Sequence, residues 1–435
     1  MQACLCYRPE KLNELGPLKP ESIPRGQGKS YGDAALNAGG NVILTERINR
    51  FAAFDPQQGT VTVEAGVTLA ALLDFLVPKG WFLPVVPGTA GVSVGGCIAA
   101  DVHGKNQHQY GNFAQSVVSL ELIVASGETL EISREQHAPL FHATTGGMGL
   151  TGLIKSAKLR LLPINSSYML TQNFAAENLD ALLDIFSRRK EQDPYSVAWL
   201  DCLGHGTQLG RGIYTAGRHA EPDEIGRDGR QPLAWHHRSR PLPLTGPLSL
   251  CLHTATARQF NQRYYKKHAA RTTPEVQPAQ KYFFPLDRFN NWNRLYGKKG
   301  FIQYQCVVAE AQAAEAIRSM LETLQNAKVP VYLGVLKRFG SHKSGLLSFP
   351  MPGYTLALDI PLRTKAVFAT LERLDEIVVQ HQGRVYLAKD ARLDSATFAK
   401  MYPDFGQWRS IKQEYDPQGL FNSSLYKRLT GEPGR

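Results

Sequence analysis

The segment PGTAGVSVGGCIAADVHGKNQHQYG, residues 87–111, contains six glycines. It is too rich in glycine for the interior of a strand or helix and too apolar for an exposed linker. Two further segments with several glycines are RGQGKSYGD at 25–33 and TTGGMGLTGLI at 144–154. We therefore expect three loops in which the backbone approaches a ligand closely.

Glycine permits positive φ angles, so consecutive N–H groups in such loops can converge on an anion such as a pyrophosphate. Any one loop could simply serve a turn, but three together favour a bound ligand. A Rossmann site needs G-x-G-x-x-G after the first strand and an acidic residue about 20 positions later, and GQGKSYGD lacks this spacing. Lys29 follows a single glycine without the pattern of a P-loop. Neither standard nucleotide motif applies.

The remaining patterns predict an α+β protein. Through residue 165, strand-like runs such as TVTVEAG alternate with turns, and Ser126-Gly127 is typical of a hairpin. Thr68 is a candidate helix cap before leucines spaced i, i+3, i+4 and i+7. Later, AENLDALLDIFSRRKE and AEAQAAEAIRSMLETLQNAKV predict helices between strands such as GFIQYQCVVA and YTLALDIPL. Residues 217–247 and 254–280 show no sustained period and are expected to be long loops.

Length and charge bound the possible functions. With 435 residues the chain exceeds the roughly 250–300 residues of one core, so two domains are expected. The net charge of +11 favours an anionic partner, either a phosphate-bearing substrate, an acidic lipid surface or nucleic acid. The basic run from Arg258 to Arg271 lacks the aromatic sheet platform of an RNA-binding module, so we expect no nucleic-acid partner.

Cysteine, histidine and hydropathy patterns narrow the class further. The six cysteines form no CxxC pair and the histidines form no HExxH, which predicts reduced thiols and no metal. The sequence shows neither a long apolar run nor a signal-peptide pattern at its start. We expect a cytoplasmic protein, with peripheral membrane contact as an open alternative.

Seven motifs, in order, resemble those of the FAD-dependent oxidoreductases of the vanillyl-alcohol oxidase type. They are the three glycine segments, GFIQYQCVV, LSFPMPGYTLALDIPL, RVYLAKDAR and YDPQGLFNSSLYKRL, and they cover nearly the whole chain. The resemblance implies a two-subdomain PCMH-type FAD-binding domain, not a Rossmann fold, made of residues 1–165 and 384–435. Residues 166–383 would form an α+β substrate (cap) domain with an antiparallel sheet.

The resemblance also implies how FAD is held. The first loop binds the pyrophosphate, the second lies along pyrophosphate and flavin, and the third lines the adenine side. Relatives with covalent flavin carry a histidine in the first loop, so Lys29 implies non-covalent FAD. The implied cofactor-binding residues are Gly26, Gln27, Gly28, Lys29, Ser30, Tyr31, Pro87, Gly88, Thr89, Val94, Gly95, Gly96, Ala99, His103, Gly104, Asn106, Gly147, Gly149, Leu150, Gly152, Ile154 and Lys389.

The candidate catalytic residues are Lys389, His103 and Gln305. Lys389 matches a family lysine at the pyrimidine edge of the flavin, where a cation stabilises negative charge on the reduced ring. His103 could accept the hydroxyl proton of the substrate, or could merely shape its loop. Strand alternation places Gln303 and Gln305 on one face, expected to face the flavin pocket, and Tyr304 on the other.

The candidate substrate-binding residues are Lys105, Phe283, Gln303, Gln305, Lys337 and Ala357. Lys337 would suit a substrate phosphate. Phe283 and Ala357 stand where well-known family members have tyrosine and cysteine, which leaves the identity of the substrate open.

The expected reaction is FAD-dependent oxidation of a secondary sugar hydroxyl to a ketone on a phosphate-bearing glycoside, including lipid-linked polyprenyl-phosphate sugars. In the family such a ketone passes to a separate short-chain reductase, which completes an epimerisation. An alternative substrate is a soluble glycoside, an aminosugar or an aldonolactone. A basic nucleic-acid- or membrane-binding protein is a third alternative, but it leaves the glycine loops unexplained.

Overall fold

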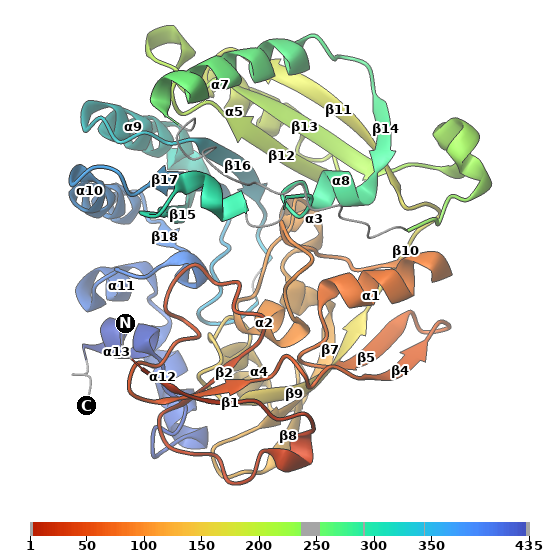
Figure 1. Ribbon diagram of the computed structural model, residues 1–435, viewed down its shortest axis with the longest axis vertical. Helices are drawn as coiled ribbons and strands as arrows, with labels where there is room; N and C mark the ends of the chain where they lie inside the picture. The colour runs from red at the N-terminus through yellow and green to blue at the C-terminus, as the bar shows by residue number, and fades with distance from the viewer. Residues whose placement is uncertain (1–2, 236–252, 290–291, 343, 432–435) are drawn as a thin grey trace.

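The computed structural model describes residues 3–235, 253–289, 292–342 and 344–431 (Figure 1). A five-stranded sheet is built from residues 51–160 and an eight-stranded sheet from residues 168–385. Helices accompany both sheets, so the predicted α+β class is confirmed. Within the described ranges no helix combines the length and apolar character needed to cross a bilayer.

The N-terminal part of the chain holds three sheets. A parallel sheet of order β1-β3-β2 comprises β1 (Leu5–Tyr7), β2 (Ser22–Arg25) and β3 (Asn41–Leu44). An antiparallel sheet of order β4-β5-β9-β7-β8 comprises β4 (Phe51–Asp55), β5 (Thr60–Glu64), β7 (Val117–Ile123), β8 (Thr129–Ser133) and β9 (Leu153–Arg160). A two-stranded sheet pairs β6 (Trp81–Phe82) with β10 (Leu162–Pro163). The predicted hairpin at Ser126-Gly127 joins β7 to β8, and Gly127 has a φ of 87°.

The helices of this part include one that the sequence marks clearly. Helix α1 (Leu69–Leu76) is capped by the Thr68 hydroxyl, which accepts the N–H of Ala71 at 3.2 Å. Its leucines are buried, and Phe75 packs against Phe51 and Phe54 of β4. Further helices of the N-terminal part are α2 (Val94–Ala99), α3 (Gln107–Tyr110) and α4 (Ala138–Thr144). Near the C-terminus the chain forms α11 (Ser395–Met401), α12 (Phe405–Tyr415) and α13 (Ser424–Thr430).

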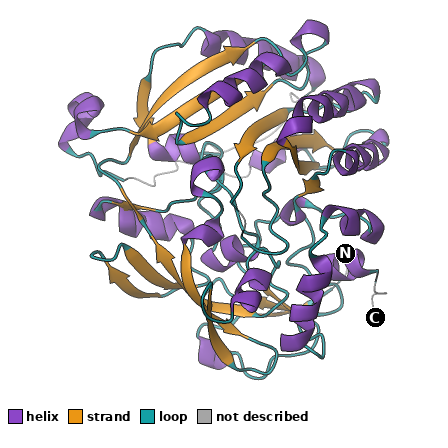
Figure 2. Cartoon of the chain, turned by 180° about the vertical axis from the view of Figure 1, so that it is seen from behind, coloured by secondary structure: helices purple, strands orange, loops and turns teal. Residues whose placement is uncertain are grey.

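The C-terminal segment returns to this part of the molecule, as Figures 1 and 2 show. The N–H of Ser22 donates to the carbonyl of Leu420 at 2.8 Å, and the N–H of Asn422 donates back to Ser22 at 2.9 Å. These bonds extend the edge of β2 with the DPQGLF segment. The exact boundaries between the expected FAD-binding and substrate domains stay a prediction, because β18 (Arg384–Val385) pairs with the eight-stranded sheet.

The eight-stranded antiparallel sheet has the order β14-β11-β13-β12-β16-β17-β15-β18. Its other strands are β11 (Tyr168–Ala176), β12 (Tyr195–Leu200), β13 (Gly212–His219), β14 (Glu275–Pro278), β15 (Phe301–Ala309), β16 (Leu333–Phe339) and β17 (Gly353–Pro361). Its helices are α5 (Leu179–Arg189), α7 (Thr254–Ala269), α8 (Ala279–Phe283), α9 (Ala313–Asn326) and α10 (Ala366–Gln380). The predicted antiparallel sheet and the helices near residues 180 and 320 are confirmed.

The two faces of this sheet differ. On one face, the Tyr304 hydroxyl donates to Asp375 of α10 at 3.0 Å, and Cys306 contacts Met320 of α9. Register places the neighbours of these strand residues on the other face, since Gln305 lies opposite Ala357 and Lys337 opposite Thr355. The polar side chains on this second face are Gln303, Gln305, Lys337, Thr355 and Asp359, and the apolar ones that register places beside them are Val307, Leu333, Val335 and Ala357.

Two expected loops are largely regular, so those predictions were wrong. Residues 254–269 form α7, and residues 217–219 end β13, with a 3-10 stretch at Pro222–Arg230. The 236–247 part lies outside the described residues. Helix α7 escaped detection because it has no apolar stripe: its buried residues are Ala257 and Asn261, which donates to Asp201 at 2.7 Å, and the half-buried Tyr264 packs on Trp199 with ring centroids 4.7 Å apart.

A buried carboxylate joins the second glycine loop to the chain before β17. Asp101 is completely buried, and its oxygens accept hydrogen bonds from the N–H of Ala114 (3.1 Å), the amide of Asn112 (3.0 Å) and the hydroxyl of Ser348 (2.6 Å). Burial raises the pKa of Asp101, and these hydrogen bonds oppose that shift. The adjacent Gln107 accepts the N–H of Gly340 at 2.7 Å, so the two segments are tied at two points.

We expect Asp101→Ala to lower the free energy of unfolding by about 3 kcal/mol, because several buried donors lose their acceptor at once. Chemical or thermal denaturation followed by circular dichroism measures this loss. The control is Glu372→Ala on the exposed face of α10, which should change stability by less than about 0.5 kcal/mol. Equal stability of the two variants would show that the Asp101 network is dispensable.

Candidate active site

The three glycine loops meet around α2. The N–H of Gly146 in the third loop donates to the carbonyl of Ile98 in α2 at 3.0 Å. A Cβ added to Gly26 in the first loop would lie 2.0 Å from the Oγ of Ser93, which caps α2. Because no other residue permits that approach, the first loop depends on glycine to reach the second. The loops predicted to bind one ligand are therefore in contact with one another around α2.

These loops fit a dinucleotide held by backbone groups. Gly28 has a φ of +59°, and a Cβ added to Gly88 would meet nothing within 4 Å. The Oδ1 atom of Asn106 and the Nδ1 atom of His103 are buried and have no hydrogen-bond partner among the described residues. Buried polar atoms without partners are costly, so these two atoms mark places where a ligand would complete the structure.

The other predicted FAD contacts fall into three groups. Pro87, Gly88, Thr89, Val94, Gly95, Gly96, Ala99 and Gly104 surround α2, while Gln27, Lys29, Ser30 and Tyr31 lie in the first loop and Gly147, Gly149 and Gly152 in the third. The side chains of Leu150 and Ile154 are buried in the core, so any contact of Leu150 with FAD would come from its backbone.

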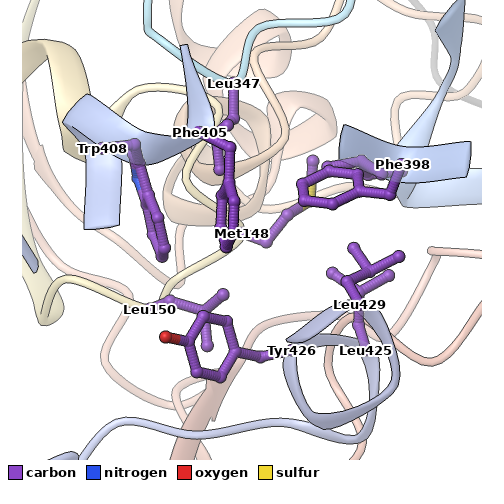
Figure 3. A pocket seen from close by; sticks show the side chains of 10 residues that line it. Met148, Leu150, Leu347, Phe398, Phe405, Trp408, Leu425, Tyr426 and Leu429 are labelled. Atoms are coloured by element: carbon purple, nitrogen blue, oxygen red, sulfur yellow. The ribbon is translucent and has the colours of Figure 1, made fainter. Parts of the chain in front are cut away.

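Leu150 also lines a small cavity between the third loop and the C-terminal helices (Figure 3). The residues that line it are Met148, Leu150, Leu347, Leu387, Phe398, Phe405, Trp408, Leu425, Tyr426 and Leu429. Its lining is almost entirely apolar, and the Trp408 N–H is already bonded to the carbonyl of Ala143. A sugar would find few polar groups there, so this cavity is a packing feature and not a substrate site.

The structure brings His103 and Gln305, two of the predicted catalytic residues, into contact. Gln305 lies on the polar face of the sheet, and its Nε2 atom is 2.9 Å from the Nε2 atom of His103. His103 is 7% exposed and is surrounded by the rings of Phe339, Phe349 and Tyr386, with centroids 4.8–5.5 Å away. Burial, with Lys337 and Lys389 nearby, holds the pKa of His103 well below its usual value, so the imidazole is neutral.

Lys389 lies where the first loop meets the C-terminal segment. It ends the 3-10 turn Leu387–Lys389, and the neighbouring carbonyl of Ala388 accepts the N–H of Tyr31 at 3.0 Å. The Nζ atom of Lys389 is 5.8 Å from the centre of the Tyr31 ring. Burial and the charge of Lys337 lower the pKa of Lys389 to about 7, while Asp359 acts in the opposite direction.

Lys105 and Lys337 approach the same region from other elements. Lys105 donates to the carbonyl of Tyr282 and lies 4.0 Å from the centre of that ring. Burial and Lys337 lower the pKa of Lys105 to about 7, and burial lowers the pKa of Lys337 to about 8. All three lysines are half-buried, the charge of Lys337 disfavours protonation of Lys105 and of Lys389, and Asp359 opposes this effect at Lys389. Such a cluster is suited to an anionic ligand.

Of the remaining predicted substrate contacts, Ala357 shares the sheet face of Gln305, but Phe283 lies in an aromatic cluster. Phe283 is 1% exposed, and its ring is 5.3 Å from that of Phe82 and 5.1 Å from that of Tyr195. One other predicted substrate-binding residue lies near it: the Nζ atom of Lys105 is 5.8 Å from the centre of the Phe283 ring. Direct contact of Phe283 with substrate remains a prediction.

Sequence reasoning missed three polar residues of the site. Thr355 and Asp359 each lie two positions from Ala357, so the strand alternation applied to β15 would have found them on β17. Asp359 accepts hydrogen bonds from Gln303 at 2.6 Å and from the Tyr296 hydroxyl at 3.3 Å.

The third missed residue is Asp287, which accepts the N–H of Ala90 in the second loop at 2.8 Å. Asp287 lies 197 positions after Ala90, and no pattern in the sequence indicates that the two residues are in contact.

Several known proteins are similar in sequence to this chain. A sequence model described as an FAD binding domain matches residues 20–133, and one described as D-arabinono-1,4-lactone oxidase matches residues 301–429. Decaprenylphosphoryl-beta-D-ribose oxidase of Mycolicibacterium smegmatis is 36% identical over 94% of this chain and 88% of its own length. An uncharacterized protein of Streptomyces coelicolor is 33% identical over 83% of this chain and all of its own length. L-gulonolactone oxidase of Scyliorhinus torazame is 23% identical over 89% and 84%.

We expect Gly28→Val to lose most of its FAD during purification. Its Cβ would fall 2.4 Å from the Arg25 guanidinium, at a φ that valine disfavours. The ratio of visible to ultraviolet absorbance measures FAD occupancy. Gly39→Val is the matched control, because Gly39 also has a positive φ of 77° but open space around it. Full occupancy in the Gly28 variant would remove the first loop from the FAD site.

Proposed function

This chain belongs to the family of FAD-dependent oxidoreductases that includes decaprenylphosphoryl-β-D-ribose oxidase, and we propose that it oxidises a secondary hydroxyl of a phosphate-bearing sugar to a ketone. It binds FAD and acts as an oxidoreductase on a sugar-like substrate. The observation that supports a phosphate is the cluster of Lys105, Lys337 and Lys389 beside the glycine loops.

In this reaction the side chains of the protein position the substrate and balance the charge that develops. When bound, FAD accepts the hydride from the carbinol carbon, and the remaining proton must leave the hydroxyl. Lys389 has a pKa of about 7, so near neutral pH its amine can hold or release a proton at Nζ. Gln303 and Gln305 present amides on the same sheet face, where they can orient sugar hydroxyls. Lys337 and Lys105 would hold the phosphate.

A lipid-linked substrate and a partner are finer parts of the proposal. A polyprenyl-phosphate sugar would bring the enzyme into peripheral contact with a membrane, and the ketone would require a reductase to complete an epimerisation. The similarity to the relative named decaprenylphosphoryl-beta-D-ribose oxidase supports a lipid-linked substrate. The reductase is proposed from the chemistry of the product alone.

A second candidate substrate is an aldonolactone or another soluble sugar. The lactone-oxidase model matches residues 301–429, which include β15, β17 and Lys389. Ala357 leaves the centre of the polar sheet face without a polar side chain, so the contacts to the sugar differ from those of relatives with a larger residue there. The non-enzymatic alternative is set aside because the family is enzymatic.

We expect anaerobic addition of a polyprenyl-phosphoryl pentose to bleach the visible absorption of the purified yellow protein. The comparison compounds are the same sugar without phosphate and an aldonolactone. Bleaching by the phosphate-bearing sugar alone supports the proposal. Bleaching by the lactone alone would move the enzyme to the second candidate, and the absence of bleaching with every sugar would overturn both.

We expect Lys389→Ala to keep its FAD but to lose about 10²- to 10³-fold in kcat, because it removes a preorganised group at the reacting centre. Stopped-flow reduction with the active sugar measures the rate, and absorbance measures occupancy. Lys365→Ala, at an exposed position before α10, is the control and should retain the wild-type rate. A Lys389 variant with wild-type turnover would exclude the catalytic assignment.

A further inference from the structure

Thr355 contacts Gln305 from the neighbouring strand β17. Its Oγ donates to the carbonyl of Cys306 at 2.9 Å, and a hydroxyl has one hydrogen to give. The 3.0 Å contact between this Oγ and the Nε2 atom of Gln305 must therefore be donated by the amide. Thr355 thus fixes which end of the Gln305 amide faces it.

The orientation of Gln305 in turn fixes His103. The second hydrogen of the same amide nitrogen is available to the Nε2 atom of His103, 2.9 Å away. A neutral imidazole carries one proton, and its Nε2 atom accepts here. The proton therefore resides on Nδ1. This atom is buried and has no hydrogen-bond partner among the described residues.

We propose that Thr355 is a positioning residue that, through Gln305, holds His103 as a neutral donor whose Nδ1–H serves an acceptor atom of the bound ligand. A buried N–H without a partner is unfavourable, and a hydrogen bond to a ligand oxygen or nitrogen would remove that penalty. The acceptor belongs either to FAD or to the sugar. In the second case the inference rests on the proposed function.

This arrangement reverses the role that the sequence suggested. A general base needs a free lone pair, whereas the Nε2 lone pair of His103 is already engaged by Gln305. The charged groups that face the imidazole, Lys337 from β16 and Lys389 from the C-terminal turn, both disfavour a second proton. The hydroxyl proton of the substrate must therefore go elsewhere, and the Lys389 amine, with a pKa of about 7, is the acceptor in this proposal.

Nitrogen NMR of the FAD-loaded protein labelled with ¹⁵N-histidine tests the tautomer without any substrate. His103 is identified among the twelve histidines by the signal that His103→Asn removes. We expect protonated Nδ1 and unprotonated Nε2 in the wild type and in Thr355→Ser, and a mixture of tautomers in Thr355→Val. Protonated Nε2 in the wild type, or an unchanged tautomer in Thr355→Val, would overturn the proposal.

Kinetics with the active sugar then locates the acceptor. We expect Thr355→Val to lower kcat/KM by about 10- to 100-fold, as loss of a group that orients a functional imidazole does elsewhere, with Thr355→Ser near the wild type. A change confined to kcat/KM places the acceptor on the sugar. A shift of the flavin absorption without sugar places it on FAD, and this readout survives failure of the proposed substrate.

The control is Thr370→Val in α10, another buried threonine, whose hydroxyl donates only to the carbonyl of Ala366 at 2.7 Å. It should leave the tautomer, the flavin spectrum and the rates unchanged. Because His103 stays neutral in the proposal, His103→Asn should lower the rate without removing any limb of the pH profile. Loss of a limb would restore His103 as the base.

Discussion

The hydrogen bonds to the buried carboxylate of Asp101 hold the site together. They connect the second glycine loop to the chain that precedes β17, where Ser348 lies 247 positions after Asp101 in the sequence. Asp101 itself has a φ of 39°, so the chain turns sharply there before it reaches His103. Because His103 lies two residues beyond this anchor, the carboxylate sets where the imidazole meets the polar face of the eight-stranded sheet.

That face is the second constraint. In an antiparallel sheet each strand sends alternate side chains to opposite sides, and here α9 and α10 cover one side of β15 and β17. The other side carries the polar residues of the site, which are neighbours across strands because the register pairs them. Gln303 with Asp359, and Gln305 with Thr355, are therefore products of the same pairing that buries Tyr304 and Cys306. The packing of one face of the sheet against α9 and α10 therefore positions the polar side chains on the opposite face.

Much of this arrangement could be predicted from local patterns. The glycine loops, helix α1 and the shared face of the two glutamines depend on backbone conformation and on a period of two or 3.6 residues, which a sequence displays directly. Helix α7 could not be recognised, because Asn261 and Tyr264 pack through partners in or next to β12, about 60 positions away in the sequence. The neutral state of His103 depends on Gln305, Lys337 and Lys389, which are about 200 to 290 positions away. Such properties belong to the tertiary structure alone.

Ligand binding near Lys105, Lys337 and Lys389 is coupled to the protonation of these three amines. Lys105 and Lys389, with pKa values of about 7, and Lys337, at about 8, are only partly protonated at pH 8. An anion bound among them favours the charged form of each amine, so its binding draws protons from the solvent. The measured heat of binding then includes the ionisation heat of whichever buffer supplies those protons, and affinity for an anion weakens as the medium becomes more alkaline. The phosphate-bearing substrate proposed above would thus bind with an affinity that depends on pH through these three amines.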